Sequence, residues 1–139
     1  MPPEETEAVA HRWHLEVVQA GRLEVADAIL APDVMVHANG QEVRGLDAAK
    51  QLASLFPIAF PDLQITHHEA IAVGNRVAIR WTSDATHQGD YFGMAPSGQP
   101  IHFEGLDFFH FRDGKIAELW IAYDNLGPFQ QAGVIPTPG

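Results

Sequence analysis

Ionisable side chains of the kind that catalyse proton transfer are concentrated between residues 101 and 124. They are embedded in a segment rich in Ile, Phe, Leu, Trp and Tyr, the residue types that favour β-strands. A sheet that is buried on one face has no structural need for so many charged groups, so this segment is a candidate for acid–base chemistry. Its ionisable residues are His102, Glu104, Asp107, His110, Glu118 and Asp124.

Asp124 is the carboxylate whose surroundings in the sequence best suit a general base. Burial among aromatic side chains disfavours the charged form of a carboxylate, which makes it a better base near neutral pH. Asp124 directly follows Tyr123 and lies close in sequence to Trp120 and Phe129. The alternative role is structural, because Asp124 precedes a short predicted helix and a carboxylate in that position commonly caps backbone N–H groups.

A base of this kind works with a donor that stabilises negative charge on a substrate oxygen. We expect His110 or His87 to donate this hydrogen bond, with His37 as a further polar group lining the pocket. The alternative for His110 is a hydrogen-bonded histidine of the core. We expect Glu118 and Trp120 to form the wall of the pocket rather than to react.

Residues 101–124 predict a hairpin, because Asp113-Gly114 is a strong turn signal between two apolar strands. Two registers fit this turn. A two-residue loop pairs Arg112 with Lys115, whereas a three-residue loop with a left-handed bulge pairs Phe111 with Lys115. We favour the three-residue loop because it keeps the like charges of Arg112 and Lys115 apart.

The favoured register divides the side chains of the hairpin into two faces, because side chains alternate along a strand. One face then gathers the candidate reactive groups, which are His102, His110, Glu118, Trp120 and Asp124. The other face is apolar and carries Phe103, Phe109, Phe111, Leu119, Ile121 and Tyr123. Because helices can cover only one face, the apolar set predicts that the protein forms a homodimer or a larger homo-oligomer.

The rest of the chain predicts helices first and long strands later. This order is typical of an α+β fold, with helices on one face of a curved sheet, in a single domain that covers residues 1–139. Apolar residues at helical spacing predict helices over 4–20, 23–31 and 48–59. Alternating patterns predict strands over 34–39, 42–44, 63–73 and 76–88.

Composition excludes several classes of partner. The net charge of −10 disfavours binding to nucleic acid or to an anionic membrane. No apolar run reaches the ~18 residues of a membrane span, and the acidic start MPPEETEAV is unlike a signal peptide. The absence of cysteine excludes disulfides and thiolate chemistry and is compatible with a cytoplasmic location.

The histidines do not form a recognisable metal site. His11 and His14 share one helix face, but no further ligand follows at zinc spacing, so we expect a surface His11 and a half-buried His14. His67 and His68 are adjacent in a strand and point to opposite faces, so they cannot bind one metal together. The sequence therefore predicts no catalytic metal.

Motifs along almost the whole chain resemble those of the SnoaL-like polyketide cyclases, a family of the nuclear-transport-factor-two-like superfamily. The most specific are Thr86-His87-x-Gly89 with Gly93 and Pro96-Ser97-Gly98, and Asp113-Gly114-Lys115-Ile116 with Glu118, Trp120, Asp124 and Gln130-Gln131-x-Gly133. The resemblance implies a cone-shaped barrel, made of a strongly curved, mostly antiparallel sheet with three helices packed on its concave side. It also implies a dimer or larger assembly.

The resemblance further implies an activity. Cyclases of the family close a ring of an aromatic polyketide by intramolecular aldol condensation without a metal or organic cofactor. In them an acid/base stands at the position that matches Asp124, and an assisting histidine at the position that matches His110. The expected partner is a polyketide-like small molecule in contact with Trp13, His37, Phe60, His87, His102, Glu118 and Trp120. Two alternatives stay open: hydroxylase, isomerase or hydrolase chemistry on the same scaffold, and a non-catalytic ligand-binding module.

Overall fold

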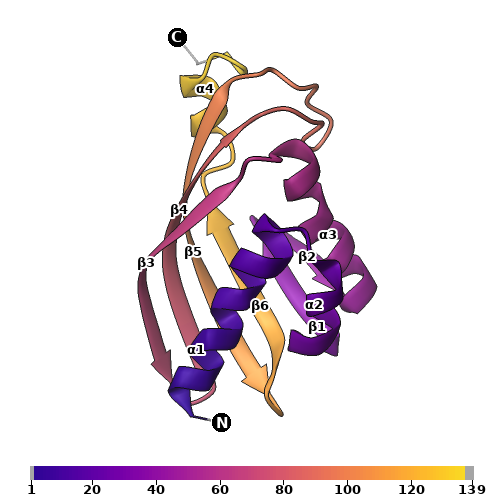
Figure 1. Ribbon diagram of the computed structural model, residues 1–139, viewed down its shortest axis with the longest axis vertical. Helices are drawn as coiled ribbons and strands as arrows, with labels where there is room; N and C mark the ends of the chain where they lie inside the picture. The colour runs from indigo at the N-terminus through magenta and orange to yellow at the C-terminus, as the bar shows by residue number, and fades with distance from the viewer. Residues whose placement is uncertain (1, 137–139) are drawn as a thin grey trace.

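A six-stranded sheet with the strand order β2-β1-β6-β5-β4-β3 forms the frame of the protein. The computed structural model describes residues 2–136, and Figure 1 shows how the long strands bend around the helices. Neighbouring strands are antiparallel except β1 and β6, which are parallel. The strands are β1 (Leu30–Ala38), β2 (Gln41–Arg44), β3 (Gln64–Val73), β4 (Arg76–Thr86), β5 (Pro100–Arg112) and β6 (Lys115–Tyr123).

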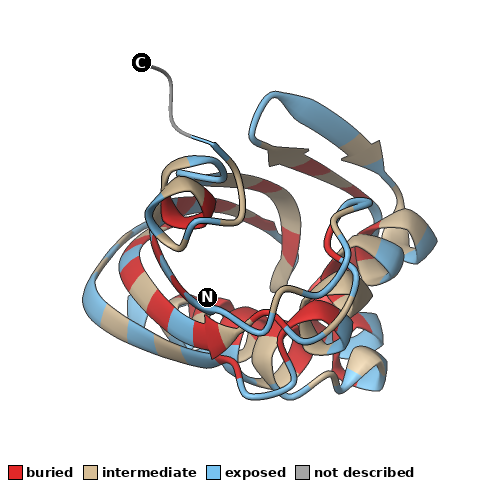
Figure 2. Ribbon diagram, turned by 90° about the horizontal axis from the view of Figure 1, so that it is seen from above, coloured by how far each residue is buried: buried red, intermediate tan, exposed pale blue. Residues whose placement is uncertain are grey.

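Helices cover the concave side of the sheet, and the hydrophobic core lies between the two layers (Figure 2). Helix α1 (Pro3–Arg12) continues without a break into a π-helical segment, η1 (Trp13–Gln19), and both contact β3. Helices α2 (Leu23–Ile29) and α3 (Leu46–Ala59) pack against β1 at the other side. The short helix α4 (Gly127–Gln131) follows β6 and contacts β5.

The inward-facing row of β5 places a carboxylate inside the core. Ile101, Phe103, Phe109 and Phe111 are buried, and the residues between the members of this row point to the outer face, as period-two alternation requires. Asp107 belongs to the same inward row and is only 3% exposed. A buried charge is costly unless it is hydrogen-bonded, so the concave face must carry donors beside Asp107.

The hairpin adopts the turn that we did not favour. Asp113 and Gly114 form a two-residue loop, and Arg112 pairs with Lys115. Both loop residues have positive φ, 52° and 77°, the geometry whose twist matches that of β-strands. The repulsion that we expected between the two cations is relieved because the guanidinium of Arg112 pairs with Asp33.

A bulge beyond this turn shifts the pairing by one residue, so that His110 lies opposite Glu118. The two predicted sets of hairpin side chains do fall on opposite faces, but the helices cover the apolar set, where Phe103, Phe109 and Leu119 are buried. The face that we expected to carry the chemistry is therefore the uncovered, convex face. The expectation that the helices leave the apolar set uncovered is wrong, because burying the aromatic row stabilises the fold more than burying ionisable groups.

The predicted α+β class and the mostly antiparallel sheet are confirmed. The sheet is not closed, since β2 and β3 remain as its two edges, so the structure is a curved open sheet rather than a barrel. Residues 2–136 contain four α-helices and one π-helical segment, where we expected three helices on the concave side. Within the same residues, no helix is long and apolar enough to cross a membrane.

Candidate active site

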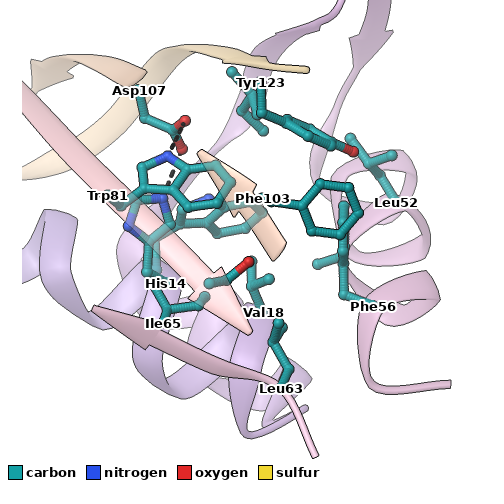
Figure 3. Close-up of a pocket in the computed structure, with 14 residues that line it drawn as sticks. His14, Val18, Leu52, Phe56, Leu63, Ile65, Trp81, Phe103, Asp107 and Tyr123 are labelled. Carbon is teal, nitrogen blue, oxygen red and sulfur yellow. Dashed lines mark hydrogen bonds and ion pairs between the residues drawn. The ribbon is translucent and has the colours of Figure 1, made fainter. Parts of the chain in front are cut away.

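An apolar pocket lies between α3, η1 and the concave face of the sheet (Figure 3). Its volume is about 40 Å³, enough for a water molecule or for the end of a larger ligand. Most of its lining is aliphatic or aromatic, but the wall also carries a histidine and a carboxylate. The lining residues are Trp13, His14, Val18, Leu52, Ala53, Phe56, Leu63, Ile65, Trp81, Ser83, Phe103, Asp107, Ile121 and Tyr123.

His14 and Asp107 form a buried pair in the wall of this pocket. Nε2 of His14 lies 2.6 Å from Oδ2 of Asp107, and the two side chains are 4% and 1% exposed. The indole N–H of Trp81 donates to the other carboxylate oxygen at 3.0 Å, as Figure 3 shows. These two donors compensate for the loss of water around the carboxylate and fix its orientation.

Local irregularities of the backbone bring these side chains together. His14 lies in η1, where the helix widens from α to π geometry, and π turns are rare and concentrated at functional sites. Trp81 packs directly over Gly105, where any Cβ atom would overlap the indole ring. The missing side chain of Gly105 therefore lets the indole lie close to β5 and reach Asp107 on the same strand.

His67 extends the buried pair toward the surface. Its Nε2 lies 2.7 Å from Nδ1 of His14, and its Nδ1 lies 2.5 Å from Nδ1 of His11. His11 is partly exposed, and its Nε2 lies 3.4 Å from a carboxylate oxygen of Glu7. Burial, together with the nearby charges of His14 and His11, lowers the pKa of His67 to about 3, so this imidazole is neutral near pH 7.

A second cavity of about 290 Å³ adjoins the pocket. Because four residues line both spaces, the two are direct neighbours, with the smaller one beside His14 and Asp107 and the larger one, a chamber, next to it. The combined shape suits a ligand with one end at His14 and Asp107 and a larger body in the chamber. The shared residues are Leu52, Phe56, Ile121 and Tyr123.

Tyr123 lines both spaces and is hydrogen-bonded to a second tyrosine, the buried Tyr91. The hydroxyl of Tyr91 donates to Oδ1 of Asn125 at 2.7 Å, so the hydroxyl of Tyr123, also 2.7 Å away, donates to Tyr91. Burial raises the pKa of Tyr123 to about 12, so both rings are neutral at physiological pH. Tyr123 therefore presents a neutral ring and hydroxyl to the site, while Asp107 is its acidic group.

The family model of the SnoaL-like polyketide cyclases matches residues 8–132. The chain belongs to this family. The match spans every element that carries the pocket, from His14 in η1 to Tyr123 at the end of β6. A comparison with the curated proteins gives no match.

Solved structures of other proteins share the fold of this SnoaL-like protein. A SnoaL-like polyketide cyclase candidate from Jannaschia sp. CCS1 has a TM-score of 0.87 at 20% identity, over 98% of this chain and 97% of that one. AclR, a candidate hydroxylase from Streptomyces galilaeus, has a TM-score of 0.82 at 29% identity, over 99% and 87% of the two chains. IdmH, a candidate polyketide cyclase from Streptomyces antibioticus, has a TM-score of 0.78 at 27% identity, over 96% and 100%.

Asp124 of this SnoaL-like protein lies outside the pocket, on the exposed segment after β6. Its carboxylate accepts hydrogen bonds from the backbone N–H groups of Gly127 at 2.9 Å and Leu126 at 3.0 Å. These bonds lower the pKa of Asp124 below its usual value, the opposite of what a buried base requires. The predicted aromatic surroundings are therefore wrong, and the local geometry is that of the capping alternative.

Five of the predicted site residues lie on the convex face, away from the pocket. The imidazole of His37 stacks on Trp120, with 5.1 Å between ring centroids, and its Nε2 lies 2.7 Å from a carboxylate oxygen of Glu118. His110 contacts the edge of Trp120, with 4.8 Å between centroids. His102 pairs with the exposed Asp84 at the far end of β5. No segment of the described chain brings these groups to His14 and Asp107.

The remaining predicted residues lie on the concave side. Trp13 lines the pocket, and its buried indole N–H has no hydrogen-bond partner in the part of the chain that the structure describes. His87 and Phe60 are fully buried and pack against each other in the core rather than lining the pocket, with ring centroids 5.9 Å apart. Nδ1 of His87 lies 2.9 Å from Oγ of Ser97, so its loop is held in place from inside.

Sequence reasoning missed the burial of Asp107 and the depth of His14, which is buried rather than half-buried. One signal was available in the sequence. Asp107 is an even number of residues from Phe103 and from Phe109, so a strand places this carboxylate on the same face as those two core residues. Across residues 2–136, no group of three or more histidines and carboxylates is arranged to hold a metal ion.

Proposed function

We propose that this protein is a cofactor-independent cyclase that closes a ring of a polyketide-like substrate by intramolecular aldol condensation, with Asp107 as its acid/base. The observation that carries the proposal is the buried pair of His14 and Asp107, 2.6 Å apart in the wall of an apolar pocket. The two donors on Asp107 hold its carboxylate in a fixed orientation toward a pocket in which a substrate carbon can be placed.

The reaction balances with this one residue as base and acid. Asp107 takes a proton from a carbon beside a carbonyl group and leaves an enolate. The enolate carbon then attacks a second carbonyl carbon of the same molecule, forming the new carbon–carbon bond and moving an electron pair onto oxygen. Asp107 returns its proton to this alkoxide, so the product is an isomer of the substrate and needs no oxidant, reductant or leaving group.

Other residues of the pocket supply orientation and charge stabilisation. A carboxylate has about four lone-pair directions, and the bonds from His14 and Trp81 to Asp107 occupy two of them, which leaves acceptor capacity for the substrate proton. The indole N–H of Trp13, which lacks a partner within the described chain, is a suitable donor for the enolate oxygen. The chamber of about 290 Å³ accommodates the part of the substrate that does not react.

A second candidate is the activation of water, as in a hydrolase. The supporting observation is that the inner cavity, about 40 Å³ in volume, is the right size for one water molecule beside Asp107. Hydroxylation, the chemistry named for the candidate hydroxylase AclR at 29% identity, is a separate alternative that needs dioxygen and two electrons in addition to this site.

The roles predicted for Asp124 as acid/base and for His110 as its assistant stay a competing proposal. The pattern of the family supports it, whereas the exposure of Asp124 and its two backbone hydrogen bonds favour a capping role. A non-catalytic binding module is a further possibility. Product analysis separates it from an enzyme, whereas variants of Asp107 and Asp124 separate the two candidate bases.

We also propose that the protein is a homodimer that pairs through the convex face of the sheet. Apolar side chains cross four adjacent strands there in one row, from Ile71 through Ala78 and Phe108 to Trp120. Leu106 beside this row is 60% exposed. Such a patch favours association, so Leu106→Glu is expected to convert a dimer mass into a monomer mass in light scattering. A monomeric parent protein would refute the proposal.

Incubation with a panel of linear and polycyclic polyketide methyl esters, followed by mass and NMR analysis of the products, tests the proposed reaction. Ring closure gives a product of unchanged mass, or of the mass less one water if the aldol dehydrates. A gain of oxygen or of water identifies hydroxylation or hydrolysis instead. Binding without any conversion over the whole panel would contradict the enzyme and favour the binding module.

A further inference from the structure

A continuous line of hydrogen-bonding side chains connects solvent with the buried Asp107. It begins at the partly exposed pair of Glu7 and His11, crosses His67 on β3, and reaches His14 in η1. The steps from His11 to His67, from His67 to His14 and from His14 to Asp107 measure 2.5, 2.7 and 2.6 Å. Every step is short enough for a direct hydrogen bond, so no water is needed to complete the line.

With Asp107 as the carboxylate that the proposed base requires, the hydrogen-bond contacts determine where each hydrogen lies. A carboxylate only accepts, so Nε2 of His14 carries the hydrogen that faces it. In neutral His14, Nδ1 is then the acceptor for Nε2–H of His67. Nδ1 of His67 must in turn accept from Nδ1–H of His11, which leaves Nε2 of His11 free to take a proton on the side of Glu7.

We propose that His11, His67 and His14 form a proton relay that exchanges protons between solvent and Asp107. The relay rests on the proposed role of Asp107 as the base. Ring closure itself returns the proton to the alkoxide, so the relay sets the protonation state of Asp107 between turnovers. The side chain of Asp107 is only 1% exposed, so very little of it is open to direct proton exchange with bulk water.

Each transfer along the relay is balanced. A proton that binds Nε2 of His11 releases the hydrogen on Nδ1 to His67, which releases its Nε2 hydrogen to His14. His14 then passes its Nε2 hydrogen to Asp107, so one proton enters and one arrives. The reverse sequence carries a proton outward and restores the starting tautomers.

The geometry of His67 separates a relay from a metal site. A histidine binds a metal through one ring nitrogen, and several ligands then converge on one point. His67 instead uses both of its nitrogens, one toward His14 and the other toward His11, so the three rings form a line. Its strongly lowered pKa means that it passes a proton on rather than storing it.

The tautomers of the three histidines in the uniformly labelled wild-type protein test the relay without any substrate. We expect long-range nitrogen–hydrogen NMR spectra at pH 7.5 to find hydrogen on Nδ1 of His11, Nε2 of His67 and Nε2 of His14. A mixed pattern, with two lone pairs or two hydrogens facing each other at one contact, would overturn the relay. This outcome is independent of whether the protein is a cyclase.

Solvent exchange at carbon tests the transfer itself. The probe is a β-keto ester that lacks the second carbonyl and therefore cannot cyclise. In D₂O, wild-type protein should replace its acidic carbon-bound hydrogen with deuterium. His67→Gln, which keeps hydrogen bonds but cannot relay a proton, should exchange at least ~10-fold more slowly and recover on addition of imidazole.

His68→Gln is the matched control, because His68 is the next residue of β3 and its side chain is exposed. Its Nε2 lies 2.7 Å from Oγ1 of Thr82, away from the three histidines of the relay. It should exchange at the wild-type rate. Equal exchange rates in His67→Gln and His68→Gln would overturn the relay. If wild-type protein exchanges no deuterium while the tautomers follow the predicted pattern, the proposed base fails and the ordered histidine line stands on its own.

Discussion

The two faces of the sheet carry nearly the same chemical groups in different surroundings. On the concave side, His14 lies 2.6 Å from Asp107, and Trp81 donates to the same carboxylate. On the convex side, His37 lies 2.7 Å from Glu118 and stacks on Trp120. The concave pair is 4% and 1% exposed, whereas the convex pair is 24% and 37% exposed.

This comparison shows that residue types and distances alone do not define an active site. Water screens an exposed pair, which contributes at most about 1 kcal/mol and leaves each group close to its ordinary chemistry. A pair inside an apolar wall cannot be screened, and a small change in its charge has a large energetic effect. The difference between the faces therefore decides which histidine and carboxylate are suited to move a substrate proton.

The largest expected effect is a difference in turnover between variants of Asp107 on the concave face and of Glu118 on the convex face. Asp107→Asn keeps the size of the side chain and removes the proton acceptor, so turnover should fall by at least ~100-fold. Glu118→Gln makes the same chemical change on the convex face and should alter turnover by less than about twofold. Steady-state kinetics on the best substrate of the panel, with circular dichroism to check folding, compares the two variants. Equal losses would remove the distinction between the faces.

The next effect tests the support of the concave pair. Gly105→Ala forces the indole of Trp81 away from β5, because the added Cβ atom overlaps the ring. We expect turnover to fall by about 10-fold and the free energy of unfolding to fall by about 1–3 kcal/mol, the usual range for overpacking. The indole N–H resonance of Trp81 should move at the same time. An unchanged resonance together with wild-type turnover would contradict the packing described for Gly105.

A smaller effect concerns the dependence of stability on pH. His67 has a pKa of about 3 in the folded protein against an ordinary value of 6.5, so between these values the unfolded chain binds more protons. Stability should therefore rise with pH across this window and level off above it. His67→Gln should flatten the rise, whereas His68→Gln should leave it intact. Urea unfolding at several pH values measures the slope, and identical slopes in both variants would contradict the burial of His67.

The smallest effect is expected at Asp124. Asp124→Asn should retain turnover within about twofold, because Asn still accepts the hydrogen bonds from Leu126 and Gly127. Asp124→Ala should lower the free energy of unfolding by about 1 kcal/mol through loss of the cap. The lowered pKa of Asp124 means that its contribution is present at neutral pH and lost as pH falls through the folded value. A ~100-fold loss of turnover in a folded Asp124→Asn would establish the competing assignment.

Local patterns in the sequence predict much of the fold. The Asp113-Gly114 turn, the alternating strands and the order of helices and strands all depend on residues that are close in the chain. The register failed at Arg112, whose charge is neutralised by Asp33 from a distant segment. No local pattern predicts such a contact, so the expected repulsion between Arg112 and Lys115 was an incomplete guide to the register.

The site was harder to predict because it is assembled from distant segments. His14 and Asp107 are 93 residues apart, and their meeting depends on η1 and on the curvature of the sheet. The sequence-based prediction followed Asp124 because a motif singled it out and because its face of the hairpin was expected to lie under the helices. The helices decide which face is covered, and alternation along a strand cannot supply that information.

The indole N–H signals of the three tryptophans report most directly on which face binds a small molecule. Trp13 and Trp81 line the concave pocket, and Trp120 lies on the convex face. Titration of nitrogen-labelled protein with a tricyclic hydroxyanthraquinone should shift the signals of Trp13 and Trp81 and leave that of Trp120 in place. A saturable shift of Trp120 alone, with Trp13 and Trp81 unmoved, would contradict the assignment of the active site to the concave pocket.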